Sequence, residues 1–158
     1  MELRRTSRAT TDSRAVLAVL ECWSVLNNRS GLVKVMIVDD NAEMRTLIRS
    51  ILSAAGREFV ECTGGADAVA RFPVERPDWT LMDVVMPEVD GLTATRRIKA
   101  QFPDSRILVI TQHQNPKLRD AAREAGAAAY LGKEELARIE EILAGTAASS
   151  WTPGSKPQ

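Results

Sequence analysis

Residues 81–91 read Leu-Met-Asp-Val-Val-Met-Pro-Glu-Val-Asp-Gly. The first of them, with the Asp-Trp-Thr that comes before, predict a buried strand that ends on Asp83. A proline and a glycine then predict a turn, and Asp90 stands where its side chain can cap a helix from about Gly91 to Gln101. The stretch therefore predicts a strand, a turn and a helix, with a carboxylate at the carboxyl end of the strand.

Four more strands are predicted from short apolar runs, at residues 33–38, 58–62, 107–110 and 128–131. The segments between them carry apolar residues three and four apart, which is typical of helices. The first helix is expected to bury one stripe and to stop at Gly56; the stripe consists of Met44, Leu47, Ile48, Ile51, Leu52 and Ala55. The second is expected to end at Pro73, the fourth to start at Pro116 with Gly126 just past its end, and the fifth to contain Leu136, Ile139, Ile142 and Leu143.

Strands that alternate with helices imply a parallel sheet with helices on both faces. In such a sheet, ligands bind beyond the carboxyl ends of the strands. The residues that follow those ends are Asp39, Asp40, Asp83, Thr111 and Lys133. The sequence therefore predicts that three carboxylates, a hydroxyl and an ammonium group lie at one edge of the sheet.

This set of groups suits phosphoryl chemistry. Three neighbouring carboxylates repel one another and raise one another's pKa unless a cation lies between them. Hard oxygen ligands favour Mg²⁺. A carboxylate can also act as a nucleophile and form an aspartyl phosphate, while a metal ion and an ammonium group neutralise charge on the phosphoryl group.

Four segments together resemble the response-regulator receiver family: Val-Asp-Asp-Asn at 38–41, residues 81–91, Val-Ile-Thr at 109–111 and Ala-Ala-Tyr-Leu-Gly-Lys at 128–133. The resemblance implies an α/β fold of the flavodoxin-like, doubly wound type. Its five-stranded parallel sheet would have the strand order 2-1-3-4-5. We expect the receiver domain to span residues 33–145.

The resemblance also implies a role for each acidic residue. Asp83 would be the phosphoacceptor, taking the phosphoryl group from a sensor histidine kinase or a histidine phosphotransfer protein. Mg²⁺ would be the cofactor. Asp40 would bind it directly, Asp39 mainly through water, and Asp83 and the backbone carbonyl of Val85 would complete the protein ligands.

The remaining implied residues connect phosphorylation to output. Lys133 would pair with Asp83 and the phosphoryl group. Thr111 would hydrogen-bond a phosphoryl oxygen, and Tyr130 would move with it. That movement would alter the face formed by the fourth helix, the fifth strand and the fifth helix, where a downstream protein would bind.

Two positions near the site depart from the family pattern, and two others lie where the family's autodephosphorylation is often tuned. Glu134 stands where many members have proline, and Gln112 where a small residue is usual. Val85 and His113 occupy positions that often tune autodephosphorylation, and an apolar Val85 cannot orient a water molecule. We therefore expect a long-lived phosphoryl group.

Two other functions compete with the phosphorelay receiver. One is a pseudo-receiver, an interaction module that never turns over phosphate; the intact set of acidic, hydroxyl and ammonium residues argues against it. The other is a phosphotransferase or phosphatase with an Asp-x-Asp nucleophile motif, which Asp39-Asp40-Asn41 does not match. We expect no enzyme activity beyond Mg²⁺-dependent self-phosphorylation and autodephosphorylation.

The composition of the whole chain limits the classes of protein to which it can belong. With 44% hydrophobic and 27% charged residues, the chain resembles a soluble globular protein. Equal numbers of basic and acidic residues argue against a nucleic-acid partner, and no apolar run is long enough for membrane insertion. Cys22 and Cys62 have no metal-site spacing, so we expect reduced thiols and a cytoplasmic location.

The two terminal segments lie outside the expected domain. Residues 1–32 predict a flexible arm, a docking helix from about Ser13 to Asn28, or a start site placed too early. Residues 146–158 are rich in small and polar residues and predict a disordered tail. We expect a stand-alone receiver; the alternative is a piece of a longer regulator.

Overall fold

The sheet has the predicted topology. A computed structural model describes residues 32–53 and 56–145, so the predictions for both terminal segments lie outside the described residues. Five parallel strands run in the order β2-β1-β3-β4-β5. Their bounds are Lys34–Val38 for β1, Glu58–Cys62 for β2, Trp79–Asp83 for β3, Ile107–Thr111 for β4 and Ala129–Gly132 for β5. The flavodoxin-like, doubly wound fold is confirmed.

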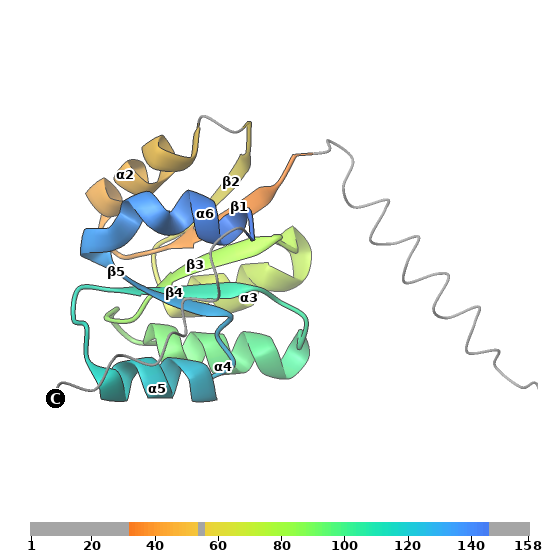
Figure 1. The fold of residues 1–158 in the computed structure, drawn as a ribbon. Helices are drawn as coiled ribbons and strands as arrows, with labels where there is room; N and C mark the ends of the chain where they lie inside the picture. Colours follow the sequence, from red (N-terminus) through yellow and green to blue (C-terminus); the bar gives the residue numbers. More distant parts are fainter. Residues whose placement is uncertain (1–31, 54–55, 146–158) are drawn as a thin grey trace, which may run out of the picture. The chain divides into compact units, whose positions relative to one another are not determined.

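Helices cover both faces of the sheet (Figure 1). On one face lie α2 (Ala42–Leu52) and α6 (Ile139–Leu143), which follows a short 3₁₀ helix, η2 (Lys133–Arg138). On the other lie α3 (Gly65–Glu75), α4 (Gly91–Gln101) and α5 (Pro116–Glu124). The carboxyl ends of the parallel strands therefore lie at one edge of the sheet, between the two helical layers.

Alternating side chains of the strands build a core on each face. In β1, Val35 and Ile37 pack with Ile48 of α2, whereas Met36 and Val38 belong to the core on the opposite face. Because successive side chains of a strand point to opposite faces, a fully apolar strand can be buried on both sides. The apolar runs in the sequence therefore mark the central strands.

The predicted helix caps are present. The Asp90 carboxylate accepts a hydrogen bond from the main-chain N–H of Thr93 at 2.9 Å and starts α4. Asn115 accepts one from Lys117 at 2.9 Å and starts α5, and Gly126 follows the end of α5 with a φ of 91°. These caps fix where each helix begins relative to the strand end before it.

The prediction that the second helix ends at Pro73 is wrong, because α3 continues to Glu75. A proline in the last turn removes a single N–H donor, which the short remainder of the helix tolerates. Arg76 then caps the end of the helix: its φ of 43° is left-handed, and its N–H donates to the carbonyl of Phe72.

Three further expectations about helices are corrected. Leu47 is 46% exposed and does not belong to the buried stripe of α2, since only a narrow face of this helix meets the sheet. The helix ends at Leu52 rather than near Gly56, and residues 54–55 lie outside the described residues. The fifth helix is divided, because Glu135 has non-helical dihedral angles, so that η2 precedes α6.

Candidate functional site

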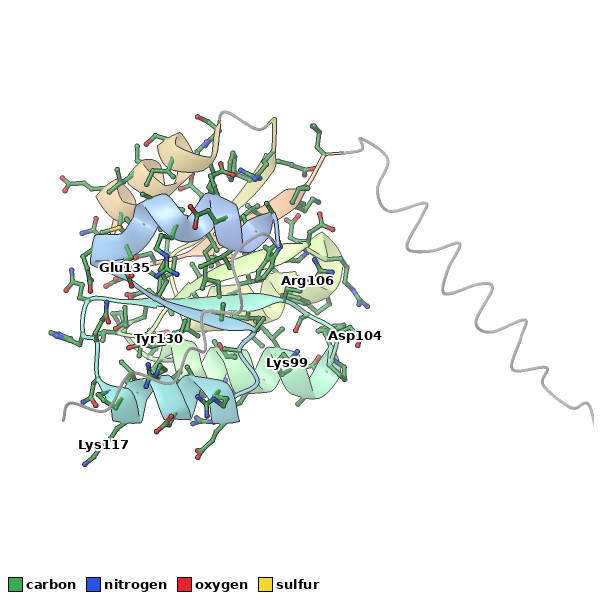
Figure 2. The ribbon with its side chains drawn as sticks, viewed as in Figure 1. Lys99, Asp104, Arg106, Lys117, Tyr130 and Glu135 are labelled. Atoms are coloured by element: carbon green, nitrogen blue, oxygen red, sulfur yellow. The ribbon has the colours of Figure 1, made fainter. Side chains whose placement is uncertain are left out.

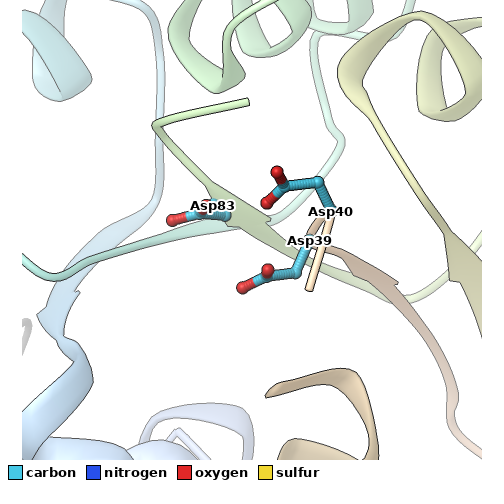
Figure 3. Close-up of side chains that lie close together, drawn as sticks. All are labelled: Asp39, Asp40 and Asp83. Carbon is cyan, nitrogen blue, oxygen red and sulfur yellow. The ribbon is translucent and has the colours of Figure 1, made fainter. Parts of the chain in front are cut away.

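Three carboxylates meet at the carboxyl edge of the sheet (Figure 3). Asp39 and Asp40 follow β1, and Asp83 ends β3, the strand beside it. One carboxylate oxygen of each residue lies within 4.8 Å of the others. Asp39 and Asp83 are buried, at 2% and 4% exposure, whereas Asp40 is exposed. The cluster therefore has one carboxylate that faces solvent and two that are largely withdrawn from it.

One ammonium group lies among these carboxylates. Lys133 follows β5, and its Nζ lies 2.8 Å from Asp39 Oδ2 and 3.2 Å from Asp83 Oδ1. A single positive charge cannot balance three negative ones, so the cluster keeps a net negative charge when all groups are ionised. Such a cluster attracts a further cation.

The pKa values agree with this interpretation. Burial, followed by the charge of Asp39, raises the pKa of Asp83 above its ordinary value. Burial alone would lower the pKa of Lys133, but its hydrogen bond to Asp39 and the charges of Asp83 and Asp39 together raise it. The donor set consists of carboxylate oxygens only, which fits Mg²⁺ in its chemistry.

A pocket opens above the carboxylates. It is lined by Asp39, Asp40, Asn41, Met44, Asp83, Val85, Gln112 and Lys133. Val85 is 66% exposed, so the entrance carries an apolar side chain. The structure thus brings five predicted site residues to one pocket: Asp39, Asp40, Asp83, Val85 and Lys133.

The other two predicted residues, Thr111 and Tyr130, lie beside the pocket and are not among its lining residues. Thr111 ends β4, is fully buried, and its hydroxyl accepts a hydrogen bond from the His113 N–H at 3.2 Å. Tyr130, labelled in Figure 2, lies in β5 and donates its hydroxyl to the His113 carbonyl at 3.1 Å. Both side chains therefore hold the same residue of the loop between β4 and α5.

Several contacts around the site were not anticipated from the sequence. Arg45 of α2 donates to the main-chain carbonyl of Asp39 at 2.8 Å. It follows the capping residue Asn41 by four positions, so helical periodicity was a signal that could have placed it near the pocket. Gln114 donates to both Glu134 and Glu135 and so joins the loop after β4 to η2; no sequence signal pointed to this contact.

The fold and the site define a class of protein. The family model described as the response regulator receiver domain matches residues 35–144, and the chain belongs to this family.

Individual relatives agree with this assignment. The response regulator MprA of Mycobacterium tuberculosis is 34% identical over 116 residues, which cover 70% of this chain and 50% of MprA. The chemotaxis protein CheY of Bacillus subtilis is 38% identical over 101 residues, which cover 63% of this chain and 84% of CheY. The chain thus spans about half the length of MprA and most of CheY.

Solved structures show the same fold. The chemotaxis protein CheY4 of Vibrio cholerae matches with a TM-score of 0.68 at 25% identity, over 73% of this chain and 99% of CheY4. A two-component response regulator of the LuxR family from Aurantimonas matches with a TM-score of 0.66 at 35% identity, over 72% and 86% of the two chains. Within the part of the chain that the structure describes, no helix is long and apolar enough to cross a membrane.

Proposed function

We propose that this chain is a phosphorylatable receiver whose phosphoacceptor is Asp83. The observation that carries the proposal is the joint placement of three carboxylates and the Lys133 ammonium group at one pocket. An acidic cluster whose negative charge is not balanced is costly to bury unless it binds a cation. A pseudo-receiver, which binds no phosphoryl group, would gain nothing from keeping such a cluster.

The acidic residues would hold Mg²⁺. Asp40 would bind it directly, Asp39 mainly through water, and Asp83 and the backbone carbonyl of Val85 would be further ligands. The ion would neutralise negative charge on the phosphoryl oxygens during transfer. Because Asp40 is exposed while Asp39 is buried against Lys133, Asp40 is the more accessible of the two for direct contact.

Asp83 would act as the nucleophile. One carboxylate oxygen forms a bond to phosphorus while the phosphorus–nitrogen bond of a donor phosphohistidine breaks, and the donor nitrogen leaves with the electron pair. The donor would be a sensor histidine kinase or a histidine phosphotransfer protein. Lys133, already within 3.2 Å of Asp83, would pair with the new phosphoryl group.

The signal would leave the site through Thr111 and Tyr130. A phosphoryl oxygen would accept a hydrogen bond from the Thr111 hydroxyl and draw the residue inward. Because His113 is bonded to both Thr111 and Tyr130, its loop would follow. The affected face comprises α5, β5 and α6, and a downstream protein would bind there, in the cytoplasm.

The chain would catalyse only its own phosphorylation and dephosphorylation. Hydrolysis of an acyl phosphate needs a water molecule aligned with the phosphorus. Val85 and Gln112 line the pocket, and the apolar side chain of Val85 cannot orient that water. We therefore propose that the phosphoryl group persists for longer than seconds in the isolated protein.

Intact-mass measurement tests the proposal directly. The protein is incubated with Mg²⁺ and phosphoramidate, beside Asp83→Asn and beside Asp104→Asn as a control for the loss of an exposed aspartate. We expect the parent and Asp104→Asn to gain one phosphoryl group, and Asp83→Asn and an EDTA-treated sample to gain none. No gain in the parent, under conditions that label a known receiver, would favour the pseudo-receiver.

A further inference from the structure

Arg45 connects the acidic cluster to the neighbouring strand. Its Nη1 donates to the main-chain carbonyl of Asp39 at 2.8 Å, and its Nε donates to Glu61 Oε2 at 3.1 Å. Glu61 belongs to β2, which pairs with β1. The Arg45 side chain is only 12% exposed, whereas that of Glu61 is 34% exposed, so both bonds are partly shielded from water.

The bond from Arg45 completes the anchoring of Asp39. The main-chain N–H of Asp39 donates to the carbonyl of Cys62 at 3.2 Å. Its Oδ1 accepts from the Asn41 N–H at 2.9 Å, and its Oδ2 accepts from Lys133 at 2.8 Å. With Arg45 on the carbonyl, every polar atom of Asp39 has a partner within the described residues.

The carbonyl of Asp39 also determines where Asp40 lies. A peptide bond is planar, so the carbonyl of one residue and the N–H and Cα of the next lie in one plane. A hydrogen bond that holds the Asp39 carbonyl therefore helps to fix the position of the Asp40 Cα, and so limits the region that the Asp40 carboxylate can reach. Asp40 is exposed, and its carboxylate forms no hydrogen bond or ion pair within the described residues that would hold it in another position.

We propose that Arg45 is a positioning residue, which holds the peptide between Asp39 and Asp40 so that Asp40 and Asp83 bind the same Mg²⁺. The inference rests on the proposed function. A positive charge beside three carboxylates opposes cation binding, so loss of the Arg45 charge alone would strengthen Mg²⁺ binding. Loss of positioning would weaken it, so the two effects have opposite signs.

Two substitutions separate positioning from charge. Arg45→Gln removes the charge and the two-pronged contact. Arg45→Lys keeps the charge, but its single nitrogen cannot replace two guanidinium nitrogens that point to different partners. Arg49→Gln is the matched control, because Arg49 also contacts Glu61, at 3.3 Å, but is 59% exposed and forms no hydrogen bond with Asp39 in the described structure.

Calorimetric titration of the whole chain with Mg²⁺ gives the first readout, with urea unfolding to confirm that each variant is folded. We expect Arg45→Gln and Arg45→Lys both to weaken Mg²⁺ binding about tenfold. Arg49→Gln should stay within about twofold of the parent, as substitutions of exposed ion pairs usually do. Glu61→Gln, which leaves Arg45 in place but weakens its support, should move the affinity in the same direction by less.

Phosphoramidate labelling over a range of Mg²⁺ concentrations gives the second readout. The Mg²⁺ concentration for half-maximal labelling should rise in both Arg45 variants, while the rate at saturating Mg²⁺ stays close to that of the parent. Tighter binding by Arg45→Gln, or parent-like binding by Arg45→Lys, would overturn the inference and leave the proposed function intact. A parent that neither binds Mg²⁺ nor becomes labelled would overturn both.

Discussion

Gly91 offers a severe test of how the end of β3, which carries Asp83, is held in place. Gly91 starts α4, and its N–H donates to the carbonyl of Val84 at 3.0 Å. A Cβ atom at this position would lie 1.8 Å from the main-chain oxygen of Asp83, whereas ordinary van der Waals contacts begin near 3.4 Å. Gly91→Ala must therefore move the start of α4 away from the end of β3.

The expected cost follows from the kind of atom that is met. Overpacking a well-packed site typically costs 1–3 kcal/mol, and a backbone atom yields less than the end of a flexible side chain, so we expect Gly91→Ala to lower the free energy of unfolding by about 3 kcal/mol. This is a large share of the roughly 5–15 kcal/mol that stabilises a typical domain. Displacement of Asp83 should also slow phosphoramidate labelling.

Urea unfolding at 25 °C, followed by circular dichroism, measures the effect. Gly64→Ala is the control, because a Cβ at Gly64 meets no atom within 4 Å and its φ of −173° is ordinary extended backbone. The control should stay within about 0.5 kcal/mol of the parent. If Gly91→Ala were as stable as Gly64→Ala and labelled at the parent rate, the close contact with Asp83 would not constrain the site.

Three further substitutions test other contacts. Arg57 binds Glu140 through two hydrogen bonds of 2.6 and 2.7 Å, and Glu140 is partly exposed, so Glu140→Gln should cost about 1–2 kcal/mol at pH 7. The hydrogen bond from Arg57 holds the pKa of Glu140 below its usual value. The stabilisation is therefore present at neutral pH and is lost as the pH falls through the folded-state pKa of Glu140. If Glu140→Gln cost as much near pH 3 as at pH 7, the assignment would be refuted. Tyr130→Phe removes the hydrogen bond to His113 and should lower the free energy of unfolding by about 1 kcal/mol; a variant as stable as the parent in urea would show that this bond contributes nothing net. Asn41→Ala removes the cap of α2, which accepts from two main-chain N–H groups, and should cost about 1 kcal/mol in the same assay; no loss would mean that water replaces the cap without penalty.

The sequence predicted the edge of the sheet well because the relevant signals are local. Each central strand is a mostly apolar run, and the polar residue at or just after its end marks the carboxyl end. Parallel strands then bring those ends together without any knowledge of side-chain packing. Asp39, Asp83 and Lys133 are adjacent in the structure for this reason.

The contacts that escaped prediction depend on distant segments or on small energy differences. The bond between Arg45 and Asp39 requires the path of α2 over the sheet, and the contact of Gln114 with Glu134 requires the relative position of two loops. Pro73 was assigned as a helix end because proline usually stops helices, but the cost of one missing donor near a terminus is small. Local patterns do not contain this information.

The distance along the chain between Asp39 and Lys133 has a consequence for synthesis. The two residues are 94 positions apart, and the ammonium group follows the last strand of the sheet. A chain still emerging from the ribosome carries all three aspartates before it carries this lysine. On the proposed function, the lysine that would pair with the phosphoryl group joins the three aspartates only when β5 docks, so the complete site would form last.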